Sequence, residues 1–158
     1  MEKFFAGVAQ TIATVHFQYT EQFLTALLPM AVTVILHGYG MKLVGLCFRR
    51  FGSRRGPRAG PHIMVVVAIV AIMLATHYVE VSSWAVFYYL TDMLPNFKSA
   101  MNFSINSYTT LGASNITLHG RWQGLDGFEA MTAMLMFGWS TAVLAVIVQR
   151  MQTLDDGN

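Results

Sequence analysis

Residues 104–118 read SINSYTTLGASNITL, a polar stretch with one glycine that lies between two long apolar segments. Backbone amides and carbonyls need hydrogen-bond partners at membrane depth. Irregular polar backbone is therefore tolerated there only inside protein or along a watery path. The stretch indicates a permeation pathway rather than a simple membrane anchor.

The composition of the chain is that of an integral membrane protein. Of its 158 residues, 54% are hydrophobic and 11% are charged, whereas about 25% charged is typical of soluble domains. No Asp, Glu, Lys or Arg lies between Ile63 and Val79, a run close to the roughly 20 residues that cross a bilayer. The single Cys47 excludes an internal disulfide and a cysteine-based zinc cluster. Because phosphate-binding and hydrolase motifs are lacking, neither an enzyme nor a bound cofactor or metal is expected.

The apolar segments predict three transmembrane helices, so the expected fold class is an all-α membrane protein. An apolar stripe at helical spacing near the N-terminus predicts an amphipathic helix that lies on the membrane or extends the first span. The expected organisation is an interfacial helix at 1–22, a first transmembrane helix at 23–48, a basic loop at 49–62, a pore module at 63–150 and a short tail at 151–158. Within the pore module, the spans are expected at 63–90 and 128–148.

Charge sets the expected orientation in the bilayer. The loop at 49–62 holds five of the ten basic residues, and the positive-inside rule places it in the cytoplasm. The N-terminus then lies outside and the C-terminus in the cytoplasm. A short loop between two spans explains these arginines without a nucleic-acid partner. The N-terminus lacks the features of a cleaved signal peptide, so the first span is expected to be retained.

A short helix is expected just before the polar stretch. Pro95 and Asn96 form a helix-start signal, and apolar residues recur at helical spacing from Phe97 to Tyr108. About a dozen residues are too few to span a bilayer. A short helix followed by an irregular glycine-bearing strand, between two spans, is the layout of a pore loop. The C-terminal end of such a helix favours a cation, and carbonyls of the strand can replace an ion's hydration shell.

Three features occur together in residues 75–150: aromatic residues at 84–89 suited to the membrane interface, the short helix from 95, and the sequence YTTLG at 108–112. In this combination the chain resembles the pore-loop potassium-channel superfamily, specifically its small bacterial ion-channel type. The resemblance implies a re-entrant pore helix and filter loop, a homotetramer in which each chain donates one loop, and a bacterial inner membrane. It also places Gly138 where the inner helix often carries a hinge.

The filter sequence departs from this family in its outer half. The family reads Thr-Val/Leu-Gly-Tyr-Gly-Asp, and the corresponding residues here are Thr110, Leu111, Gly112, Ala113, Ser114 and Asn115. The resemblance implies that the first five form the ion filter and that Asn115 forms its mouth. Ala113 lacks the bracing aromatic ring, and Ser114 replaces a glycine that tolerates positive φ. A weakly selective pore for K⁺ or Na⁺ and a closed, non-conducting pore are both compatible with these changes.

Two ionisable residues lie inside the second span. His77 and Glu80 are three residues apart and share a helix face, and ionisable groups at membrane depth are candidates for function. Three roles are open for them: a structural hydrogen bond from Glu80 to the back of the pore loop at Ser107 or Tyr108, a proton site, and a metal site joined by His37. Two ligands are half a metal site, since catalytic zinc usually has three protein ligands.

Glycines and acidic residues near the third span each have two interpretations. Gly138 is either a gating hinge or a contact for another helix. Asp126 and Glu129 either concentrate cations at an outer mouth or occupy an exposed helix start. In the first span, the tripeptide at 38–40 spells the family's filter motif, but no short helix precedes it. With Gly45, these glycines are expected to allow close helix packing.

Three functions are compatible with these observations. The leading one is a tetrameric channel for passive conduction of monovalent cations. The second is a channel-derived structural or accessory subunit of a larger membrane complex that no longer conducts. The third is a membrane enzyme or metal transporter that uses His37, His77 and Glu80.

Overall fold

The computed structural model describes residues 1–52, 59–112 and 115–156, with side chains at all of these except 59–62 and 154–156. The described residues form four α-helices, a π-helical turn and a 3₁₀ turn: α1 Glu2–Cys47, η1 Phe48–Gly52, α2 Ala59–Leu90, α3 Phe97–Tyr108, η2 Gly120–Trp122 and α4 Leu125–Asp156. Within these ranges no strand occurs. Three of the helical segments are long and apolar enough to cross a membrane, which confirms the all-α class and fits a membrane-embedded protein.

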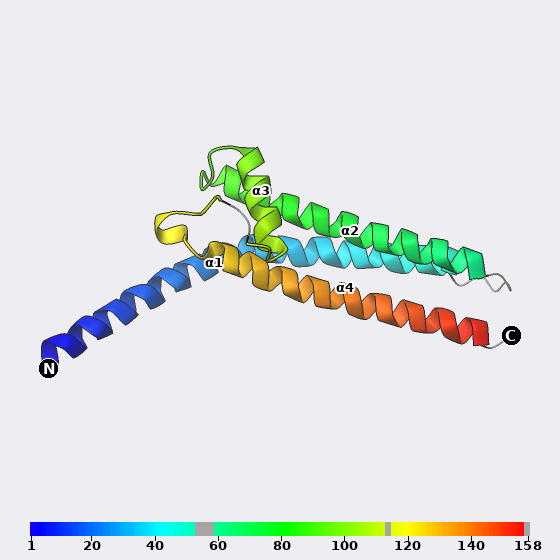
Figure 1. Ribbon diagram of the computed structural model, residues 1–158, viewed down its shortest axis with the longest axis horizontal. Helices are drawn as coiled ribbons and strands as arrows, with labels where there is room; N and C mark the ends of the chain where they lie inside the picture. The colour runs from blue at the N-terminus through cyan, green and yellow to red at the C-terminus, as the bar shows by residue number, and fades with distance from the viewer. Residues whose placement is uncertain (53–58, 113–114, 157–158) are drawn as a thin grey trace.

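The long helices run side by side, and α3 lies across one end of them. Figure 1 shows the cyan part of α1 beside α2 and α4, with α3 packed near the end of α2 and the beginning of α4. The end of α1, the beginning of α2 and the end of α4 all lie at the opposite end. The short helix is therefore separated by the length of the bundle from Arg49 and Arg50, which follow the end of α1.

Helix α1 is one continuous helix, so the segment at 1–22 extends the first span at 23–48, the second of the two arrangements expected for it. Its 46 residues extend about 69 Å at 1.5 Å per residue, more than twice the roughly 30 Å hydrocarbon thickness of a bilayer. No residue before Gln22 is buried, and the blue N-terminal part points away from the bundle (Figure 1). Pro29 lies inside the helix without breaking it, although a proline there removes a backbone hydrogen bond.

Helix α3 begins where the sequence predicts. The side chain of Asn96 accepts a hydrogen bond from the backbone N–H of Ser99 at 2.9 Å, which satisfies one of the free donors of the first turn. The helix has 12 residues, about 18 Å at 1.5 Å per residue. It is too short to cross a bilayer, as expected.

The C-terminal end of α3 is a Schellman motif. The N–H of Thr110 donates to the carbonyl of Ser107, and the N–H of Leu111 donates to the carbonyl of Asn106, both at 3.0 Å. This motif needs a left-handed residue after the last helical turn, usually glycine. Here the residue is Thr110, with φ of 57°, so the first residue expected in the filter carries backbone strain.

Two apolar clusters hold the helices together. The cluster at the α3 end includes Trp84, Tyr88 and Phe103, and the cluster at the other end includes Val44 and Ile69. Trp84 and Tyr88 are 0% exposed. These two rings, which belong to the aromatic group expected at the membrane interface, therefore contact protein: they pack in the cluster that includes Phe103 of α3.

Candidate functional site

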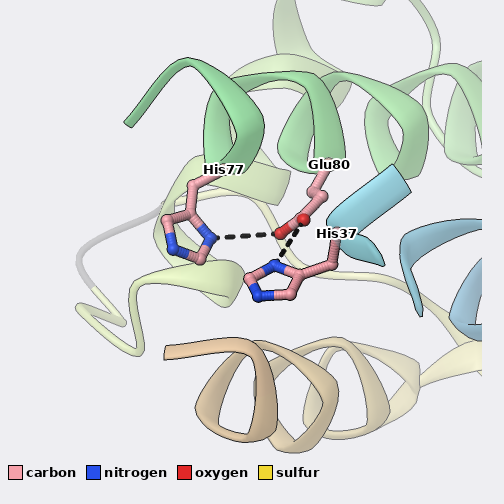
Figure 2. A group of neighbouring side chains, drawn as sticks. All are labelled: His37, His77 and Glu80. Carbon is pink, nitrogen blue, oxygen red and sulfur yellow. Dashed lines mark hydrogen bonds and ion pairs between the residues drawn. The ribbon is translucent and has the colours of Figure 1, made fainter. Parts of the chain in front are cut away.

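The polar centre of the bundle joins α1 to α2. Glu80 receives hydrogen bonds from two histidine rings: His37 Nδ1 lies 2.9 Å from Oε1, and His77 Nδ1 lies 3.1 Å from Oε2. Figure 2 shows both rings directed at the one carboxylate, His77 from the same helix and His37 from α1. His37 and Glu80 are 43 residues apart, and sequence periodicity alone does not predict their contact.

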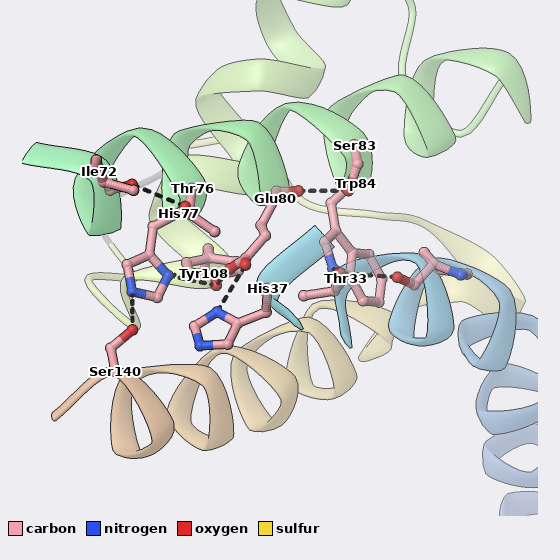
Figure 3. Close-up of polar contacts among 11 residues, drawn as sticks. Thr33, His37, Ile72, Thr76, His77, Glu80, Ser83, Trp84, Tyr108 and Ser140 are labelled. Atoms are coloured by element: carbon pink, nitrogen blue, oxygen red, sulfur yellow. Dashed lines mark hydrogen bonds and ion pairs between the residues drawn. The ribbon is translucent and has the colours of Figure 1, made fainter. Parts of the chain in front are cut away.

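Helices α3 and α4 complete this centre. The hydroxyl of Tyr108, at the end of α3, donates to Glu80 and lies 3.1 Å from His77 Nδ1. His77 Nε2 lies 3.1 Å from the hydroxyl of Ser140 on α4, as Figure 3 shows. The expected hydrogen bond between Glu80 and the back of the loop at Tyr108 is thus present. Burial, followed by the hydrogen bond to Glu80, raises the pKa of the Tyr108 hydroxyl, so it remains a donor.

Aromatic rings cover the histidines. Trp139 lies 5.0 Å from His37 and Phe137 lies 4.8 Å from His77, measured between ring centroids. The side chains of His37 and Glu80 are fully buried, whereas that of His77 is 13% exposed. Nε2 of His37 is buried and has no hydrogen-bond partner among the described residues. The centre is therefore nearly dry, and His77 is its accessible edge.

Two contacts set the position of α1 on α2. The indole N–H of Trp84 donates to the hydroxyl of Thr33 at 2.9 Å, one turn from His37 (Figure 3). On the other side of His37, a Cβ at Gly40 would lie 2.3 Å from the hydroxyl oxygen of Thr76. The helices approach this closely only because residue 40 has no side chain.

The other glycines differ from Gly40. A Cβ at Gly38, Gly45 or Gly138 would meet no atom within 4 Å in the described chain. Within one chain the packing interpretation therefore holds for Gly40 and fails for Gly38 and Gly45. For Gly138 no contact with another described helix exists, and α4 is helical on both sides of it.

Glu129 forms a second buried carboxyl centre that the sequence analysis missed. It is 0% exposed, and it lies 2.9 Å from the hydroxyl of Tyr88 and 2.5 Å from that of Ser104. Both interpretations of Glu129 as an exposed acid at a mouth or helix start are wrong. It links α4 to α2 and α3. Asp126, one turn earlier, is half-buried.

The residues expected to form the filter follow α3 directly. Thr110, Leu111 and Gly112 are exposed in the single chain, as is Asn115, and Ala113 and Ser114 lie outside the described residues. A cavity of about 460 Å³ lies between this loop, α3 and the beginning of α4, and its lining includes Asn106, Thr117 and Asp126. The described filter residues Thr110, Leu111 and Gly112 donate backbone hydrogen bonds to Ser107 and Asn106 in the last turn of α3. Tyr108, two residues before Thr110, connects this loop to Glu80.

Chemically, the first centre offers two imidazoles, a carboxylate and a phenol, a donor set that holds a proton or a transition-metal ion. The second offers a carboxyl group and two hydroxyls, which suit a structural brace.

The sequence did not predict the buried contacts of Ser140, Thr33 and Glu129, although each lies on the buried side of its helix. For α4 these buried residues are Leu125, Glu129, Thr132, Ala133, Met136 and Ser140. The exposed side of α4 is apolar as well, with Met131, Met134 and Leu135, so its buried stripe does not stand out in the sequence.

No protein-family model matches the chain, and neither a curated protein nor a solved structure is significantly similar to it.

Proposed function

We propose that the chain is the subunit of a homotetrameric membrane channel that conducts monovalent cations passively. In this proposal the loop from Thr110 to Ser114 surrounds the ion path, and α4 lines the inner cavity. The observation that carries the proposal is the position of α3, a capped half-length helix between two membrane-length helices, whose C-terminal end leads into an exposed polar loop. A short helix of this kind does not serve as a membrane anchor.

The anchoring of α3 supports this role. Tyr108 bonds to Glu80 on α2, and Ser104 bonds to Glu129 on α4. Both bonds lie on the buried side of α3, whereas Thr109 to Gly112 remain exposed. An ion-binding loop needs a rigid support, since ligands must be held in position to replace a hydration shell. Two buried carboxyl groups behind one 12-residue helix supply such support.

The exposure of the loop supports assembly. Leu111 is 69% exposed and Leu135 on α4 is 68% exposed. Exposed apolar side chains on membrane helices face lipid or neighbouring chains, and polar backbone at that depth must be covered by protein or line a water-filled path. Four copies around an axis would cover the exposed apolar side chains and would enclose the polar backbone of the loop around a water-filled path. The membrane in this proposal is a bacterial inner membrane. With the basic segment in the cytoplasm, the C-terminus is cytoplasmic as well, and the N-terminus lies on the outer side.

The test is ion flux through purified protein in liposomes. The proposal expects K⁺ and Na⁺ to cross under an applied voltage and expects chemically cross-linked protein to run as a tetramer. The double variant Ala113→Tyr with Ser114→Gly restores the family's filter residues, and it should raise the ratio of K⁺ to Na⁺ flux. Tyr78→Phe, at an exposed position of α2, is the matched control and should leave this ratio unchanged.

Absence of flux for K⁺, Na⁺ and Cs⁺ from both the natural chain and the double variant would overturn the proposal. That result would favour the alternative, an accessory subunit that keeps the channel architecture without conducting.

A further inference from the structure

We propose that His37, His77 and Glu80 form a binding site for a divalent transition-metal ion, with zinc as the ion that fits the donors best. The site joins α1 to α2 inside the bundle. It does not depend on conduction, because an ion held there contacts side chains of the helices and not the loop after α3.

The donor chemistry is that of known zinc sites. Two histidines and one glutamate are a recurrent set of zinc ligands, with a fourth position left to water or another oxygen. One candidate ligand atom from each of these three residues lies within 4.8 Å of the other two. Tyr108 places a phenolic oxygen against the same carboxylate. Donor groups from α1, α2 and α3 therefore gather at the carboxylate of Glu80.

The spacing needs only small adjustments. Donors around a tetrahedral zinc ion lie about 3.3 Å apart, given bonds of about 2.0–2.1 Å. The two nitrogen–oxygen pairs are 2.9 and 3.1 Å apart, so an ion would widen them slightly. The two rings lie 5.4 Å apart between centroids and approach the carboxylate from different helices (Figure 2). Small side-chain rotations bring both Nδ1 atoms to bonding distance.

The site has outer support of the kind that zinc-binding histidines use. A ligating imidazole usually donates its other N–H to a nearby oxygen, which fixes its orientation. Ser140 provides that oxygen for Nε2 of His77 at 3.1 Å. Nε2 of His37 has no partner among the described residues. With its hydrogen on Nε2, His37 presents the lone pair of Nδ1 to the ion. The hydrogen bond between Nδ1 and Glu80 is then replaced by a bond from each group to the metal.

The three side chains are buried enough to hold an ion away from water, and one of them is exposed enough to let it enter. His37 and Glu80 are fully buried, and rings from α4 pack against the two histidines. Such surroundings exclude water and strengthen the attraction between the ion and the carboxylate. His77 is 13% exposed and provides the way in. Without an ion, the hydrogen bonds to Glu80 keep the same groups together, so the fold does not require the metal.

The test measures bound metal and needs no flux. Protein purified without a histidine tag is incubated with zinc, passed through a desalting column and analysed for metal. The natural chain should retain about one zinc ion per chain, and His37→Ala and His77→Ala should each retain less than about a tenth of that amount. His16→Ala and His119→Ala, which remove exposed histidines, are the matched controls and should bind as the natural chain does.

A second kind of variant distinguishes the loss of a metal ligand from a loss of folding. His77→Cys replaces one ligand by a thiolate, which also binds zinc and cobalt. With Co²⁺ it should show the charge-transfer absorption of a cobalt–thiolate bond. The natural chain, whose one cysteine is Cys47, should not show it. A natural chain that retains no zinc, equal zinc in His77→Ala, or a His77→Cys protein without this absorption would each overturn the proposal. None of these results bears on conduction.

Discussion

Ser104 contacts two acceptors at once, the carbonyl oxygen of Val81 at 2.9 Å and the carboxyl group of Glu129 at 2.5 Å. The Ser104 hydroxyl has one hydrogen, so it can donate a well-aligned hydrogen bond to one of these acceptors only. All contacts are satisfied if Ser104 donates to Val81 and Glu129 carries a proton that it donates to Ser104, while Tyr88 donates to the other carboxyl oxygen. A neutral carboxyl also avoids the cost of a buried charge without a cationic partner.

This arrangement predicts that Glu129→Gln is well tolerated. A glutamine amide donates to Ser104 and accepts from Tyr88, as the protonated acid does. The cost should be under about 1 kcal/mol. Glu129→Ala leaves the buried Tyr88 hydroxyl without its acceptor and takes one of two partners from Ser104, and it should cost about 2–4 kcal/mol. Thermal unfolding in detergent measures both. A Gln variant as unstable as the Ala variant would show that Glu129 is ionised and accepts both bonds.

Removal of the Tyr108 hydroxyl tests the link between α3 and the buried histidines. Tyr108→Phe keeps the ring but takes one donor from Glu80, and the buried carboxylate loses a hydrogen bond worth about 1–3 kcal/mol. The unfolding midpoint should fall accordingly. Tyr78→Phe, which alters an exposed tyrosine, should leave it unchanged. Equal midpoints for the two variants would contradict the assignment of Tyr108 to this centre.

The close approach of α1 and α2 predicts opposite effects at two glycines. Gly40→Ala places a Cβ 2.3 Å from the hydroxyl oxygen of Thr76, and such overpacking typically costs about 1–3 kcal/mol. Gly38→Ala has open space and should gain up to about 1 kcal/mol from the higher helix propensity of alanine. Unfolding midpoints separate the two. Stabilisation by Gly40→Ala would mean that the helices are further apart than described.

The left-handed residue at the end of α3 predicts that glycine is favourable at position 110 and unfavourable at position 109. A non-glycine residue in this conformation costs about 1–2 kcal/mol, so Thr110→Gly should relieve strain. Thr109 has φ of −81°, and Thr109→Gly should cost about 0.5–1 kcal/mol through added chain entropy. The difference between their unfolding midpoints is the measured quantity. Lower stability of Thr110→Gly than of Thr109→Gly would contradict the Schellman geometry.

The sequence predicted local structure well and contacts between helices less well. Asn96 capped the short helix as expected, because capping depends on neighbouring residues alone. The sequence left open whether the segment at 1–22 is a separate helix or an extension of the span at 23–48, and the structure has one continuous helix there. The contact of His37 with Glu80 depends on how α1 packs against α2, and apolar periodicity carries little information about packing when lipid-facing side chains are apolar too.

Polar residues would have been a better guide to the interior than apolar ones. The buried polar side chains include Gln22, Thr33, His37, Glu80, Glu129 and Ser140. In a membrane helix such groups turn toward protein, since lipid offers them no partner. Glu129 was misplaced because it lies near the start of its helix, where an exposed acid is common. Its burial follows from its contacts with Tyr88 on α2 and Ser104 on α3, which depend on how the helices pack.

The first twenty residues of α1 form a helix that the rest of the chain does not stabilise. Phe4, Phe5, Ile12 and Phe17 are each more than 60% exposed, and no residue of the segment is buried. A helix that relies on its own backbone bonds is only marginally stable in water. The helical state of this arm is therefore conditional on its surroundings, and its amide hydrogens should exchange quickly wherever lipid or a second chain does not cover them.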